Sequence, residues 1–153
     1  MSNLAKALLL TGVFLLSACA TNTAVRLSTT SAIERAAWDE ACARTEYRCF
    51  MVNPPKVGTS EYVGILKAYG FYNGGNTVFL KKDLDITDTF GFAVLVHEMV
   101  HYLQARSDKF PYPGKLSSCM MEEEAWEVYN EVVVSQGRQD LFVKEWFKAY
   151  PGC

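Results

Sequence analysis

The chain has few histidines and no excess of charge of either sign. Only 2 of its 153 residues are histidine, and the formal net charge is −2. A protein that binds nucleic acid would need a basic face, so this charge balance argues against a nucleic-acid partner. The pair Gly74-Gly75 lacks the Lys-Ser/Thr that follows the glycines of a phosphate-binding loop. A serine nucleophile would need a histidine base, and both histidines belong to the motif described below.

Long apolar runs are also missing, and the longest lies near the start of the chain. The run Ala7–Leu16 follows a single lysine and is too short to cross a bilayer, so we interpret residues 1–18 as a signal peptide. It ends in Leu16-Ser17-Ala18-Cys19, which resembles the lipobox of bacterial lipoproteins, where cleavage precedes a cysteine that is lipidated. The resemblance implies attachment to a membrane of the bacterial cell envelope. Because Ala20 follows the cysteine, it also implies an outer-membrane lipoprotein facing the periplasm. The alternative is an ordinary signal cut and a secreted protein.

Four cysteines remain if Cys19 carries the lipid: Cys42, Cys49, Cys119 and Cys153. An even number outside the cytoplasm indicates two disulfides. Of the three possible pairings we favour Cys42–Cys49, which is local, and Cys119–Cys153, which would hold the C-terminus. A four-cysteine zinc site would need shorter spacings.

The patterning predicts a lipidated cysteine and flexible tether over residues 19–30 and one α+β domain over residues 31–153. The order is a helix, a hairpin and then further helices, which predicts a small antiparallel sheet, or hairpin, packed on the Thr89–Ser107 helix and further C-terminal helices. The expected elements are a helix over Ala32–Thr45, a short strand over Cys49–Val52, strands near Gly64–Tyr72 and Thr77–Lys81 around a tight turn at Asn73–Asn76, a helix over Thr89–Ser107 capped by Thr87 or Asp88, a helix over Ser118–Gln136 ended by Gly137, and a helix over Asp140–Tyr150.

The motif H-E-x-x-H stands at His97–His101, within an otherwise apolar helix. Residues four apart lie on one face of a helix, so both imidazoles can bind the same metal ion. A divalent ion, most plausibly Zn²⁺, lowers the pKa of a bound water to about 7, and Glu98 would take the proton of that water. The competing interpretation is a pair of core histidines. It requires separate partners for three buried polar groups, whereas one metal and its water satisfy them all.

A third protein ligand must come from another part of the chain. No histidine remains and the cysteines are assigned to disulfides, so we expect a carboxylate from the acidic run in the next helix. Glu123 and Glu127 project away from the apolar face of that helix. Spacing leaves Glu122 and Glu124 as candidates.

The His97–His101 motif, followed on the next helix by Glu-x-x-Ala, resembles a small gluzincin-type zinc metallopeptidase. The resemblance covers about Thr77–Tyr129. It implies a minimal zincin-like fold, Glu122 as the third ligand, and a small residue, Ala125, where the two helices approach. It also implies that the Thr77–Lys81 strand pairs with an extended substrate.

Such enzymes often carry an extra His or Tyr that stabilises the tetrahedral oxyanion. With no histidine left, the candidates are Tyr102, Tyr112, Tyr129 and Tyr150.

The sequence therefore predicts a zinc-dependent metallopeptidase anchored in the envelope, with an envelope protein or peptide as substrate. His97, His101 and Glu122 would bind zinc, and Glu98 would act as general base. The alternative belongs to another class. It is a non-catalytic, zinc-stabilised lipoprotein that binds an envelope partner.

Overall fold

The computed structural model describes residues 32–65, 68–110 and 115–139. The expected signal peptide and tether, Cys19, the helix expected at Asp140–Tyr150, and Cys153 lie outside these residues. The described elements, in chain order, are a helix over residues 32–44, η1 (Cys49–Met51), β1 (Lys56–Ser60), α2 (Glu61–Ile65), β2 (Gly70–Tyr72), β3 (Thr77–Lys81), α3 (Thr89–Gln104) and α4 (Lys115–Ser135).

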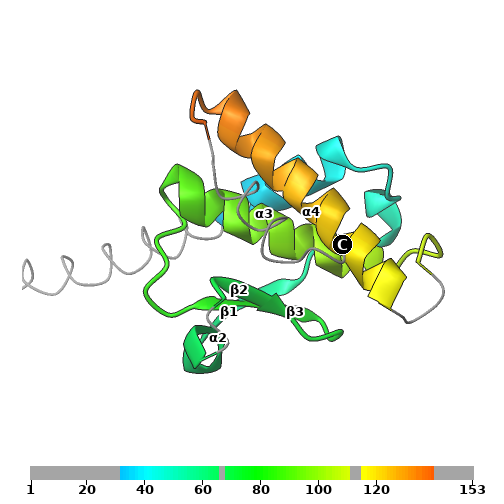
Figure 1. Ribbon diagram of the computed structural model, residues 1–153, viewed down its shortest axis with the longest axis horizontal. Coiled ribbons are helices and arrows are strands. Elements are labelled where there is room, and N and C mark those ends of the chain that lie inside the picture. The colour runs from blue at the N-terminus through cyan, green and yellow to red at the C-terminus, as the bar shows by residue number, and fades with distance from the viewer. Residues whose placement is uncertain (1–31, 66–67, 111–114, 140–153) are drawn as a thin grey trace, which may run out of the picture. The chain divides into compact units, whose positions relative to one another are not determined.

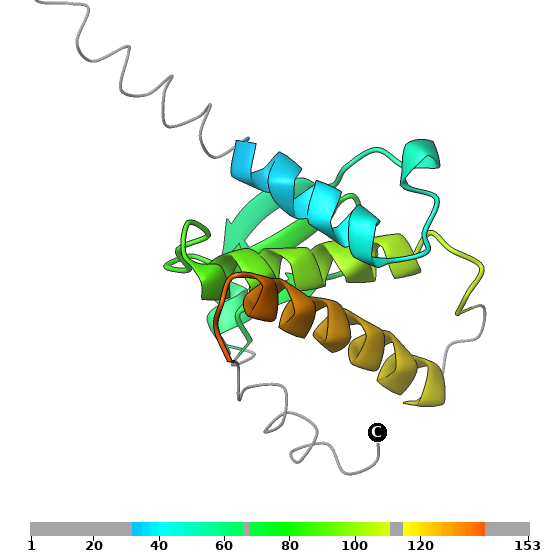
Figure 2. The ribbon, with the colours of Figure 1, turned by 90° about the horizontal axis from the view of Figure 1, so that it is seen from above.

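Helix α3 is the centre of this α+β fold. One side of it covers the three-stranded sheet (Figure 1). The helix of residues 32–44 and α4 flank it on either side (Figure 2). No helix in the described residues has both the length and the apolar character needed to cross a bilayer.

The hydrophobic core surrounds α3. The side chains of Leu95, Met99 and Leu103 are almost wholly buried, as are Val78 on β3 and Val132 on α4. Burying an aliphatic side chain of this size contributes about 1.5–3 kcal/mol. The apolar environment of the H-E-x-x-H turn is therefore part of the main core.

The ends of the two long helices follow local rules. The Asp88 side chain accepts a hydrogen bond from the backbone N–H of Gly91 at 2.7 Å, which caps α3. Asp88, one of the two expected residues, is thus the cap. Helix α4 ends before Gly137, whose φ of 76° is readily adopted by glycine. Both helix predictions are confirmed to within a few residues.

The sheet is mixed, with strand order β1-β3-β2. β2 and β3 form the expected antiparallel hairpin, and Gly74 takes a φ of 87° in its turn. β1 was not expected, and it pairs in parallel with β3. The expected α+β class and antiparallel hairpin are therefore confirmed, and the parallel strand β1 makes the sheet as a whole mixed.

The place of β3 overturns one implication of the resemblance. β3 is hydrogen-bonded on both sides, so the strand Thr77–Lys81 has no free edge to pair with a substrate. β2 is an edge strand of the sheet, and it packs against α3.

Two strand predictions are also wrong in detail. Cys49–Val52 was expected to be a strand, but residues Cys49–Met51 form the 3₁₀ helix η1, whose turn is closed by local bonds from Met51 N–H to Arg48 and from Val52 N–H to Cys49. The strand expected near Gly64–Tyr72 is only Gly70–Tyr72, because Glu61–Ile65 form the short helix α2.

Candidate metal centre

His97 and His101 lie one turn apart on the same face of α3. Their Nε2 atoms are 3.0 Å apart, and the planes of the two rings are almost perpendicular. The side chain of His97 is 6 % exposed, and its ring packs against Trp126 of α4. The two nitrogens expected to bind a metal therefore converge toward α4.

Glu122 of α4 completes the group. Its carboxylate oxygens lie 3.6 Å from Nε2 of His97 and 3.3 Å from Nε2 of His101. Ala125, one turn later, is fully buried in the core that joins the two helices, as expected for a small residue at a close approach. The spacing argument left Glu122 and Glu124 as candidates, and only Glu122 is in the group of donors around the histidines.

The three side chains converge closely enough to bind one small ion. Ligand bonds of about 2.0–2.1 Å at tetrahedral angles place donor atoms about 3.3 Å apart. The two Nε2 atoms are 3.0 Å apart, one oxygen of Glu122 lies 3.3 Å from Nε2 of His101, and its other oxygen lies 3.6 Å from Nε2 of His97. One donor atom from each residue lies within 4.8 Å of the other two. Two imidazole nitrogens and a carboxylate are also the donor types that zinc commonly takes.

Charges at the site favour a cation between the three side chains. Burial lowers the pKa of His97 to about 4, so this ring is neutral at pH 7. Burial also opposes the charge of His101, but a hydrogen bond to Glu122 and the charges of Glu122 and Glu98 raise its pKa to about 9. The pKa of Glu122 is held well below its usual range, against burial, by both histidines. Without metal, the proton on His101 is the positive charge that this environment stabilises.

Glu98 occupies a narrow space between α3 and β2. Its side chain is 5 % exposed, and a Cβ atom on Gly70 would lie only 2.5 Å from Glu98 Cγ and Oε1. Burial, with the charge of Glu122, raises the pKa of Glu98 to about 7, although the charge of His101 lowers it. A carboxyl group that titrates near pH 7 is suited to accept and return a proton.

Gln104 is a site residue that the sequence analysis missed. It lies one turn beyond His101, is 1 % exposed, and its Oε1 is 2.7 Å from Nδ1 of His101. Its Nε2 donates to the backbone carbonyl of Met121 at 2.8 Å and to Glu124 at 2.9 Å. The available signal was a polar residue three positions after the second histidine, on the same helix face.

Glu124 accepts hydrogen bonds from other side chains and is not in the group of donors around the histidines. Lys109 Nζ donates to it at 2.6 Å, and the Tyr47 hydroxyl donates to its other oxygen. Burial opposes ionisation of Glu124, but hydrogen bonds from Lys109, Tyr47 and Gln104 lower its pKa. Its part at the site is therefore to receive hydrogen bonds behind the histidines.

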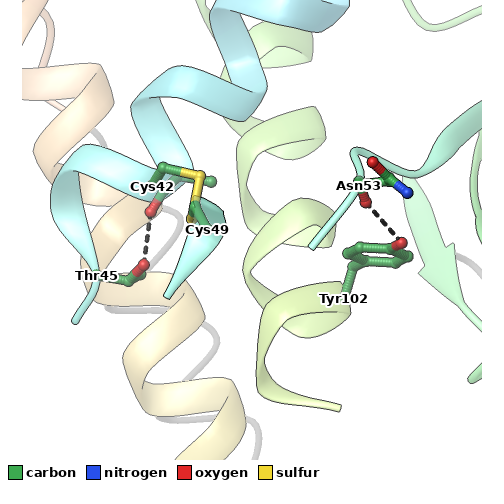
Figure 3. The surroundings of a disulfide bond; sticks show 6 residues. Cys42, Thr45, Cys49, Asn53 and Tyr102 are labelled. Atoms are coloured by element: carbon green, nitrogen blue, oxygen red, sulfur yellow. Dashed lines mark hydrogen bonds between the residues drawn. A yellow bond between two sulfur atoms is a disulfide. The ribbon is translucent and has the colours of Figure 1, made fainter. Parts of the chain in front are cut away.

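The local disulfide is confirmed. Cys42 and Cys49 are bonded across a separation of seven residues (Figure 3). Cys119 is also disulfide-bonded, whereas Cys153, its expected partner, lies outside the described residues. The sulfurs of the described cysteines are thus taken up in disulfides, which agrees with a metal site built from histidine and carboxylate.

Two of the oxyanion candidates, Tyr102 and Tyr129, lie within the described residues. The Tyr102 hydroxyl donates to the carbonyl of Asn53 at 2.8 Å (Figure 3). Tyr129 is fully buried and packs against Trp126 and Phe90. Tyr112 and Tyr150 lie outside the described residues.

Comparison with known proteins gives no relative: no protein-family model, curated protein or solved structure matches the chain.

Proposed function

We propose that this protein is a zinc-dependent metallopeptidase. The observation that carries the proposal is the group of His97, His101 and Glu122, which offer one donor atom each within 4.8 Å of one another. Glu98 adds a buried carboxyl group next to the first histidine, with a pKa near 7. A core that needed only structural histidines would not require a third ionisable group in the same turn.

Zinc bound by these three residues would polarise the carbonyl group of the substrate and lower the pKa of a coordinated water. Glu98 would accept a proton from the attacking water as the new C–O bond forms. It would return that proton to the amide nitrogen as the C–N bond breaks, which yields a carboxylic acid and an amine. Burial keeps the Glu98 carboxyl out of bulk water, so its proton is transferred locally.

The substrate is proposed to be an envelope protein or peptide, reached from a membrane to which lipidated Cys19 attaches the chain. β2 is the edge strand beside α3, and its first residue lies against Glu98. An extended segment paired with β2 would pass close to the proposed base.

The burial of His97 and Glu98 also suits the alternative, a non-catalytic lipoprotein in which zinc joins α3 to α4. The two functions differ in the fourth zinc position. A hydrolase needs it open to water, whereas a purely structural site fills it with a protein ligand. The group found among the described residues has three protein donors, which favours the hydrolase.

The first test is the metal content of the purified protein, measured by elemental mass spectrometry. We expect about one zinc per chain from a single four-coordinate site, and its loss in His101→Ala. Glu122→Gln should weaken zinc binding, whereas Glu123→Gln, an exposed neighbour on the same helix, should leave it unchanged. Equal affinities in these two variants would contradict Glu122 as a ligand.

The second test separates catalysis from metal binding. Glu98→Gln should retain zinc and lose hydrolysis of a fluorogenic peptide library, because the amide cannot take up a proton as the carboxylate does. Loss of zinc in Glu98→Gln would contradict its role as base. A wild type that holds zinc at four protein ligands and cleaves nothing would establish the structural alternative.

A further inference from the structure

Gln104 is oriented by its own hydrogen bonds. Both of its amide N–H groups have acceptors, the carbonyl oxygen of Met121 and a carboxylate oxygen of Glu124. Rotating the amide by 180° would place its oxygen against these two oxygens, so that acceptors would face acceptors and both hydrogen bonds of the amide would be lost. The amide oxygen of Gln104 must therefore face His101.

This orientation determines how His101 carries its hydrogen. The amide oxygen only accepts, so Nδ1 of His101, 2.7 Å away, must be the donor. The Nε2 atom is then the one that can lose its proton and bind a metal. It is also the atom that lies next to His97 and Glu122.

His97 differs from His101. Its buried Nδ1 atom makes no side-chain hydrogen bond within the described residues, and besides His101 and Glu122 its ring interacts with the backbone of Ala125. Of the two imidazoles, only that of His101 is therefore oriented by a chain of side-chain hydrogen bonds.

Glu124 connects these hydrogen bonds to a distant part of the sequence. Besides Gln104 it binds Lys109 and the hydroxyl group of Tyr47. Tyr47 lies inside the loop that the Cys42–Cys49 disulfide closes. The loop thus contributes a donor to the network behind the metal ligand.

We infer that Gln104 and Glu124 are positioning residues that hold His101 in the Nδ1–H form, with Tyr47 and Lys109 fixing Glu124. The inference rests on the proposed zinc site and adds residues that change its affinity for zinc. Hydrogen-bond partners of metal-bound histidines typically change metal affinity by about 10–100-fold.

The test compares zinc affinities of the full-length protein by competition with a chelator. Gln104→Leu keeps a similar volume and removes the acceptor, and we expect zinc to bind about 10–100-fold more weakly. The exchanged pair Gln104→Glu/Glu124→Gln again places an acceptor beside His101 and a donor between positions 104 and 124, although it gives no donor to the carbonyl of Met121. It should therefore recover part of the lost affinity. Glu123→Gln serves as the control on α4.

A spectroscopic measurement separates positioning from packing. Long-range ¹H–¹⁵N spectra of the zinc-loaded wild type should show His101 protonated at Nδ1 and metal-bound at Nε2, and the exchanged pair should keep this pattern.

Folded Gln104→Leu that binds zinc as tightly as the wild type would overturn the inference, as would an exchanged pair no better than Gln104→Leu. If Gln104→Leu does not fold, the wild-type spectrum still decides, because coordination through Nδ1 of His101 would overturn it. A wild type that binds no zinc would instead refute the proposed function.

Discussion

Replacing Gly70 by alanine should displace Glu98 without replacing any residue of the proposed site. The new Cβ would lie 2.5 Å from both Cγ and Oε1 of Glu98 and 2.8 Å from Cδ. Ordinary contacts between carbon atoms are about 3.5–4.0 Å, so one of the two groups must move by about 1 Å or more. The glutamate side chain is the flexible partner, and it would turn away from β2.

A displacement of about 1 Å in a reacting group can lower the rate by about 100-fold. We expect a loss of that order in kcat for Gly70→Ala. Zinc affinity should be unchanged, because Glu98 is not one of the three proposed ligands. If Glu98 turns toward water, its pKa should fall from about 7 toward the ordinary value of 4.5, since burial is the main cause of the shift.

The assay pairs peptide hydrolysis with zinc content, and ¹³C NMR of labelled glutamate in the metal-free protein follows the pKa of Glu98. Gly64→Ala is the matched control, because a Cβ at that exposed position meets only Lys81 Cε at an ordinary 3.8 Å. Gly70→Ala with the wild-type rate and an unshifted pKa for Glu98 would refute the reasoning.

Three other perturbations follow from the contacts described above. The pKa of His101 is raised to about 9, so zinc must displace the proton of His101 below that pH. Calorimetry in buffers of different ionisation enthalpy should show about one proton released per zinc at pH 7. The affinity for zinc should rise about tenfold per pH unit between pH 6 and 8. Arg106→Ala should lower the free energy of unfolding by about 2 kcal/mol in urea titrations, because the guanidinium stacks 3.5 Å from the Tyr102 ring centroid and donates to the hairpin carbonyl of Gly75 at 2.8 Å; an unchanged midpoint would contradict this. Replacing Cys42 and Cys49, which are seven positions apart, by serine should cost about 2.5 kcal/mol from chain entropy and weaken zinc binding as well. Full zinc affinity in that variant would show that the disulfide loop is not needed for the site.

The parts of the fold that depend on neighbouring residues were predictable from the sequence. The cap at Asp88, the turn at Gly74 and the facing of His97 and His101 each follow from spacings of a few residues. Glu122 was harder to assign, because spacing within α4 could not distinguish it from Glu124. That choice depends on how α3 and α4 pack.

The elements that were missed depend on contacts between distant segments. β1 has a weak apolar pattern, and its strand conformation depends on parallel pairing with β3 from Lys56–Thr77 to Ser60–Lys81. Gln104 was missed for a similar reason, since its hydrogen-bond partners Met121 and Glu124 lie on α4. The local sequence around β1 or around Gln104 does not specify these partners.

The division of the metal group between α3 and α4 has a consequence for the order of events during folding. Two of the three donors belong to one turn of α3, and Glu122 belongs to a helix that is synthesised later and must dock before the group is complete. A chain with its hairpin and α3 formed, but with α4 still undocked, would present only two ligands and would hold zinc weakly. Metal uptake would then follow the docking of α4 on α3, and the proposed hydrolytic activity would arise only in molecules that have completed this step.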